Sequence, residues 1–156
     1  MYSIMETDDL YTPLHIGSCY SFGYGVLTPE RICREVKKRG HRAVGLVDRH
    51  NFYGMVRFLR AAARESIKPI LGMTLLRGGR PAGTAYVLDR RGFLRLTRIV
   101  STPGQDDPIQ DLLSGGWEGL ALMSSDPSVL DSLSRAGRRG LYVQLTYGSP
   151  FRELLQ

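Results

Sequence analysis

The amino-acid sequence predicts an α/β fold in which mostly parallel strands are joined by crossover helices, with one β-hairpin. Short apolar runs, such as residues 43–47, alternate along the chain with segments whose apolar residues recur at helical spacing. Such alternation is typical of a largely parallel sheet with crossover helices. The hairpin is indicated by the Arg-Gly-Gly-Arg turn at residues 77–80, which separates two strand-like runs.

Each expected element carries a local signal. Thr28 is a helix-capping residue, Pro29 favours the first helical position, and Gly40 is a natural stop. The helix at 53–65 is expected to place Val56, Leu59, Ala62 and Ala63 on its apolar face. In chain order we expect a strand at 13–16, a helix from 29, a strand at 43–47, a helix at 53–65, strands at 68–76 and 82–88, a helix at 92–100, a short helix after the loop 101–108, a strand at 120–123, a helix at 128–135, a strand at 141–146 and a helical tail at 150–156.

Length and composition predict one cytoplasmic domain spanning residues 1–156. The 156 residues, 42% of them hydrophobic, are enough for an ordinary core. No apolar run approaches the roughly 20 residues of a membrane helix, and the first ten residues lack a signal-peptide pattern. Cys19 and Cys33 lack the CxxC spacing of a zinc site, so we interpret both as buried free thiols.

The excess of basic over acidic residues mildly favours a polyanionic partner. Its net charge is +6 and its isoelectric point about 9.6, but the basic residues are spread along expected helices. Solvated helix faces explain them more simply than a binding site. Contact with DNA is therefore expected only as a weak, sequence-independent effect, and no membrane partner is expected.

Three stretches resemble, in order and spacing, motifs of the polymerase and histidinol phosphatase (PHP) domain. LHIGSCYSF at 14–22 resembles the opening LHxHSxYS motif. AVGLVDRHNFYGMVRF at 43–58 resembles ALTDHxNxxGxVxF, and IKPILGMT at 67–74 resembles IKPIxGxE. Residues 88–96 are similar to a further helix of the family. The long second stretch is most similar to the alpha subunit of bacterial DNA polymerase III, including its error-prone kind.

This resemblance implies a partial, irregular (β/α) barrel of PHP type, which is expected to be incomplete because the family's later ligands normally lie in a second half of the domain. It also implies a metal cluster, and position by position most of that cluster is lost. His15 and Asp48 match two ligands. Gly17 and Arg49 stand where the family has histidines, and Thr74 stands where it has glutamate. Glycine offers no ligand and a guanidinium has no acceptor atom, so we expect no bound metal and no catalytic residue.

Several side chains have simpler explanations than a role in a site. We expect Arg49 to fill the space of a lost cation and pair with Asp48. Asn51 is expected to cap the following helix, and His41 is expected to be exposed near a helix C-terminus. Ser18 and Ser21 lack the GxSxG pattern of a catalytic serine.

Three interpretations of function remain open from the sequence. The first is a degenerate PHP-like domain with a structural or partner-docking role in DNA replication or repair, contacting other polymerase domains or a proofreading exonuclease. The second is an active PHP phosphoesterase or exonuclease using Zn, Mn or Fe, and the resembled parent is itself a DNA-directed DNA polymerase. The third is an unrelated small α/β binding protein. Half a barrel would leave an open sheet edge, so self-association is also expected.

Overall fold

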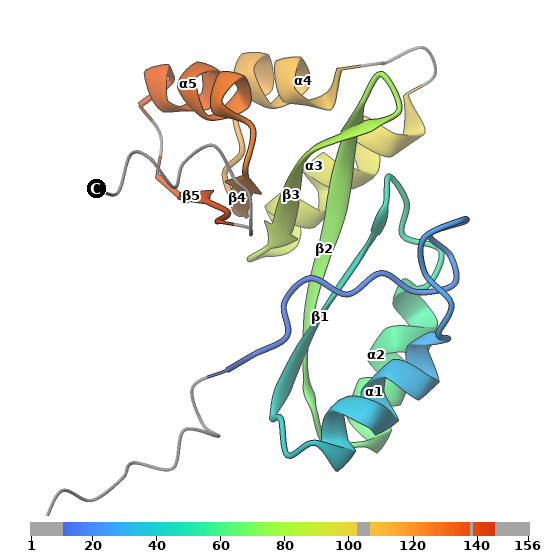
Figure 1. Cartoon of the computed structure of the whole chain (residues 1–156). Helices are drawn as coiled ribbons and strands as arrows, with labels where there is room; N and C mark the ends of the chain where they lie inside the picture. Colours follow the sequence, from blue (N-terminus) through green and yellow to red (C-terminus); the bar gives the residue numbers. More distant parts are fainter. Residues whose placement is uncertain (1–10, 103–106, 138, 146–156) are drawn as a thin grey trace, which may run out of the picture. The chain divides into compact units, whose positions relative to one another are not determined.

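The computed structural model describes residues 11–102, 107–137 and 139–145 (Figure 1). The chain separates into two compact units, Met1–Gly72 and Met73–Gln156. The single-domain expectation stays a prediction. No helix in the described ranges combines the length and apolar character needed to cross a membrane.

The first unit contains α1 (Pro29–Lys38), β1 (Ala43–Arg49), α2 (Met55–Arg64) and the beginning of β2 (Lys68–Arg77). Thr28 is the N-cap of α1, with its hydroxyl accepting from the Arg31 amide, and Pro29 opens the helix as predicted. Gly40 follows the helix with a φ of +80°, a backbone conformation that favours glycine. The strand predicted at 13–16 is reduced to one parallel bridge between Ile16 and Leu46.

The apolar face predicted for α2 is confirmed for Ala62 and wrong for Val56, Leu59 and Ala63. Val56 and Leu59 are 52% and 40% exposed, whereas Phe58 is completely buried. The helix begins at Met55, and its apolar residues cover more than one face. Their spacing alone therefore does not determine which face is buried. The core of the unit lies between the helices and β1 and comprises Ile32, Cys33, Val36, Val44, Leu46, Phe58, Ala61, Ala62 and Ile67.

The two cysteines have different environments, so the prediction of two buried thiols is confirmed for Cys33 only. Cys33 is fully buried in that core and Cys19 is half-buried; both are free. Burial, together with the charges of Glu65 and Glu30, raises the pKa of the Cys33 thiol to about 11.

Cys33 is therefore expected to resist thiol reagents in the folded protein. At pH 8 a chromogenic disulfide reagent should react rapidly with one thiol per chain, and with the second only after denaturant is added. The Cys19→Ala variant should lose the rapid phase, while Cys33→Ala should keep it. Rapid reaction of both thiols in the folded chain would contradict this assignment.

The second unit contains the rest of β2, β3 (Arg80–Val87), α3 (Arg90–Ser101), α4 (Pro108–Gly115), β4 (Leu120–Ser124), α5 (Pro127–Arg135) and β5 (Leu141–Val143). The predicted hairpin between β2 and β3 is confirmed. Gly78 and Gly79 form its turn, both with positive φ, as a two-residue hairpin turn of this kind requires. β5 is shorter than the strand predicted at 141–146, and the predicted tail helix lies outside the described residues.

The strand order is β1-β2-β3-β4-β5, so the α/β class is confirmed and no pairing among the described residues closes a barrel. β3 pairs antiparallel with β4, placing Thr84 opposite Met123, and β4 pairs parallel with β5, placing Leu122 opposite Leu141. The β4–α5–β5 connection is a crossover of the predicted type. Self-association through an open edge stays a prediction.

Candidate functional site

The first unit holds a buried polar cluster around the carboxylate of Asp48, at the C-terminal end of β1. Asp48 is only 2% exposed, and Ser18 and Ser21 are equally buried. Asp48 Oδ1 accepts from the Ser18 amide at 2.7 Å and from the Ser21 hydroxyl at 2.7 Å. The Ser18 hydroxyl lies 2.9 Å from Oδ1 and 2.8 Å from Oδ2. A buried carboxylate is thereby satisfied without a cation.

The cluster fixes the loop at 17–27 against the end of β1. The Ser21 Oγ accepts from the Arg49 amide at 3.1 Å, and the Ser18 Oγ accepts from the Tyr20 amide at 3.2 Å. The Asn51 side-chain amide donates to the Tyr20 carbonyl at 3.1 Å. In Figure 1 this loop, in blue, runs beside the segment that follows β1. The two serines act as buried cross-links here.

Two glycines border the same cluster. A Cβ at Gly17 would lie 3.2 Å from the Ser21 Oγ, so Ser21 stands beside the position where the family has its second histidine. A Cβ at Gly54 would lie 2.9 Å from Asp48 Oδ2 and 3.2 Å from the Ser18 Oγ. Gly54 has an ordinary helical φ of −78°, so packing against the carboxylate is what requires glycine.

The expected pairing of Arg49 with Asp48 is wrong. Within the residues that the structure describes, the hydrogen bonds of the Asp48 carboxylate come from Ser18 and Ser21. The Arg49 guanidinium instead lies 3.4 Å from the centre of the Tyr24 ring. Successive side chains of a strand point to opposite faces. Asp48 points into the protein, so Arg49 points the other way.

His15 and Thr74 have environments of their own. His15 is exposed at the surface, although the protein atoms packed around its ring lower its pKa by desolvation. Thr74 is buried in the interior of β2 and belongs to the second unit, so it is described separately from Asp48. Within the described ranges, no group of three or more His, Cys, Asp or Glu side chains is arranged to hold a metal ion.

The segment after β1 differs from its prediction. Asn51 does not cap α2, because the N-cap is Gly54; its side chain accepts from the Tyr53 amide and closes a turn before the helix. His50 has a φ of +52°, and burial lowers its pKa. His41 is half-buried against the Tyr11 ring, with its amide bonded to the Val36 carbonyl of α1, so its predicted exposure is wrong.

Sequence reasoning missed Ser18 and Ser21 as partners of Asp48. Both serines lie in the 14–22 motif, and the family resemblance implies that this motif and Asp48 contribute to one cluster. The available signal was chemical: a buried strand that ends in a carboxylate and lacks its metal ligands needs other donors. The stacking of Arg49 on Tyr24 had no comparable signal, because it depends on how the loop folds back.

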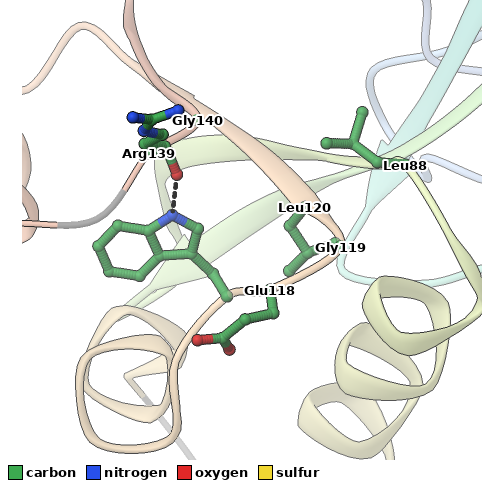
Figure 2. A pocket seen from close by; sticks show the side chains of 7 residues that line it. Leu88, Glu118, Gly119, Leu120, Arg139 and Gly140 are labelled. Carbon is green, nitrogen blue, oxygen red and sulfur yellow. Dashed lines mark hydrogen bonds between the residues drawn. The ribbon is translucent and has the colours of Figure 1, made fainter.

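The second unit contains a hollow with a volume of about 570 Å³ (Figure 2). Leu88, Leu120, Gly119 and Gly140 give it an apolar lining, with Glu118 and Arg139 beside them. The buried Trp117 indole donates to the Arg139 carbonyl at 3.0 Å. The hollow lies at the N-terminal end of β4, whereas ligands in parallel sheets gather at C-terminal ends, so the Asp48 cluster is the better candidate site.

Comparison with known proteins identifies the family. A sequence model of the PHP domain matches residues 13–147. The error-prone DNA polymerase of Mycolicibacterium paratuberculosis is 38% identical over 177 aligned positions, covering 90% of this chain and 16% of the polymerase. The error-prone DNA polymerase of Anaeromyxobacter sp. strain K is 34% identical over 139 positions, covering 85% of this chain and 12% of the polymerase. This chain thus spans about a sixth or less of the length of these relatives.

A solved structure supports the same fold assignment. An amidohydrolase from Chromobacterium violaceum with bound sulfate and no metal has a TM-score of 0.57 and 16% sequence identity, and the match covers 83% of this chain and 75% of that protein. At this identity the likeness concerns the fold alone. With the family match over residues 13–147 and the relatives among polymerases, the chain belongs to the PHP domain family.

Proposed function

We propose that this chain is a PHP domain whose metal-ligand position has become a structural one, and that it acts as a structural or docking module of a DNA polymerase. The observation that carries the proposal is the Asp48 carboxylate, which receives hydrogen bonds from Ser18 and Ser21 in a buried pocket. A metal ligand needs a lone pair directed at the ion, and three donor hydrogens from Ser18 and Ser21 already use most of the roughly four acceptor sites of the carboxylate.

The residues at the family's other ligand positions do not fit a metal. Arg49 lies over the Tyr24 ring, and its guanidinium has no acceptor atom with which to bind a metal ion. Gly17 contributes no donor atom, and its missing side chain leaves Ser21 in contact with Asp48. Thr74 offers a neutral hydroxyl in place of a carboxylate. This donor set favours a cation-free cluster over the alternative of a metal-dependent phosphoesterase.

The length of the relatives supports a role within a larger assembly. The chain corresponds to between 12% and 16% of the polymerases of M. paratuberculosis and Anaeromyxobacter, so the remainder of such a polymerase is the natural docking partner. A proofreading exonuclease is the other candidate partner. In either case the chain would contribute a binding surface and no catalytic residue to DNA replication or repair. The family match argues against the third interpretation, an unrelated binding protein.

Elemental analysis of protein purified without chelator tests the metal part of this proposal. Zinc, manganese and iron are each expected well below one equivalent per chain, also after incubation with the ions and desalting. The matched reference is the variant Gly17→His, which restores a histidine beside Ser21 in the Asp48 cluster and should retain more metal. Near-stoichiometric metal that is lost in His15→Ala would contradict the proposal and restore the phosphoesterase alternative.

A further inference from the structure

The loop at 17–27 and the segment after β1 expose three aromatic side chains. Phe22, Tyr24 and Tyr53 are 77%, 71% and 70% exposed. Hydrogen bonds of Asp48 and Asn51 join the two segments, so these rings belong to one region of the first unit. Exposed aromatic side chains gathered in one region of a unit indicate a surface that binds a partner or ligand.

Arginines accompany these rings. The Arg49 guanidinium stacks on Tyr24 at 3.4 Å, which holds that ring in place while leaving most of its surface exposed. Arg57 donates to the Tyr20 hydroxyl at 3.1 Å and forms a two-point ion pair with Glu30, at 2.7 and 3.1 Å. The hydrogen bond from Arg57 lowers the pKa of Glu30. This pair connects the aromatic region to the first turn of α1.

A basic hollow continues from that turn along α1. It has a volume of about 290 Å³ and is lined by Arg31, Arg34, Lys38 and Glu35. Glu35 is paired with Lys38 at 3.3 Å and with Arg39 at 3.1 Å. Among the described residues, the ion pairs formed by acidic side chains of α1 do not involve Arg31 or Arg34. The hollow therefore has an excess of positive charge.

Most of the net positive charge of the chain lies in this unit. Residues 1–72 contain 11 Lys and Arg against seven Asp and Glu, a net charge of +4 out of the +6 of the whole chain, and four of these acids lie in residues 11–72. One of the four acids is buried Asp48 and two others are paired with arginine or lysine. The field around the aromatic rings and the α1 hollow is accordingly positive, and its natural ligand is a polyanion.

We propose that Phe22, Tyr24, Tyr53 and the α1 hollow form a binding site for single-stranded DNA that works without a metal. The exposed rings stack on unpaired bases, and Arg31, Arg34 and Lys38 contact the phosphates. Exposed aromatic rings beside a cationic groove are the two features by which proteins hold single strands without sequence preference. This surface is separate from the buried Asp48 carboxylate and goes beyond a docking role.

Fluorescence anisotropy with a labelled dT oligonucleotide of about 15 nucleotides, a length within the range that one such site covers, tests the proposal with the full chain in low salt and EDTA. Binding is expected, and a duplex of the same length should bind more weakly because its bases are already stacked. The Phe22→Ala, Tyr24→Ala double variant should lose about tenfold or more in affinity, with the salt dependence unchanged. The control is Leu88→Ala, Leu94→Ala, which removes exposed apolar side chains of the second unit.

The cationic part has its own signature. Arg31→Ala, Arg34→Ala should reduce the slope of log affinity against log salt by about 0.7 for each phosphate that the protein no longer neutralises. Arg90→Ala, Arg98→Ala removes the same charge from α3 and should leave the slope nearly unchanged. Circular dichroism should show every variant folded, because all the altered side chains are exposed.

Three results would overturn the proposal. Absence of oligonucleotide binding by the folded chain would leave the rings as a protein-docking surface. Equal affinity for single strand and duplex would reduce the interaction to general electrostatics. Loss of binding in EDTA, regained on addition of Mn²⁺, would assign the DNA contact to a metal centre and not to these rings.

Discussion

Replacing Asp48 with alanine is expected to lower the free energy of unfolding by about 3–5 kcal/mol, enough to unfold a marginally stable domain. The substitution leaves three buried donors unsatisfied: the Ser18 amide and the hydroxyls of Ser18 and Ser21. It also removes the cross-link between the loop at 17–27 and β1. Urea denaturation followed by circular dichroism measures the effect.

Two further variants show whether this loss comes from the cluster. Ser21→Ala removes one donor and the acceptor of the Arg49 amide, so an intermediate loss is expected. Asp131→Ala removes an exposed carboxylate paired with Arg135 on α5 and should leave the denaturation midpoint unchanged. If Asp48→Ala were as stable as the parent chain while losing bound metal, Asp48 would be a ligand and not a structural residue.

Replacing Gly45 with alanine is expected to destabilise the first unit by about 3 kcal/mol or more, because the new methyl group has no room. A Cβ at Gly45 would lie 2.0 Å from the Leu14 carbonyl oxygen, a backbone atom that cannot move alone. The 13–16 segment would have to separate from β1. It would then lose the hydrogen bonds from the Gly45 and Val47 amides to the Pro13 and Ile16 carbonyls, both 2.8 Å.

Hydrogen exchange locates this effect within the chain. In Gly45→Ala, the amides of residue 45 and of Val47 should exchange faster than in the parent protein, while those of β4 keep their protection. Gly17→Ala is the matched control. The nearest atom to its added Cβ is the Ser21 hydroxyl at 3.2 Å, a side chain that can adjust, so a much smaller loss is expected. Equal stability of the two variants would mean that residues 13–16 do not pack as described.

Asp48 and Gly45 both act on the loop that precedes β1 in the chain. The end of β1 carries a carboxylate that accepts hydrogen bonds from its neighbours, and a glycine within the strand lets residues 13–16 approach closely. Both features serve to position the loop at 17–27. That loop carries Phe22 and Tyr24, so its rigidity connects the buried cluster to the proposed binding surface.

The sequence by itself determined the α/β class, the family, the hairpin and the start of α1. These depend on local chemistry that the chain carries wherever it folds: Thr28 and Pro29 begin α1, and Gly78 and Gly79 supply the positive φ of the hairpin turn. The motif comparison also identified Asp48 and the substituted positions Gly17 and Arg49, because each of them is recognised from its place in a local sequence motif.

Only the tertiary structure decided which groups surround Asp48 and which face of α2 is buried. The Ser18–Asp48 and Ser21–Asp48 contacts join residues about 30 positions apart, so no local pattern encodes them. Phe58 is buried and Leu59 partly exposed because the position of α1 selects between two apolar faces of one helix. The stacking of Arg49 on Tyr24 likewise depends on the tertiary structure. The strand period predicts that neighbouring side chains point to opposite faces, but it does not predict which residue each side chain contacts.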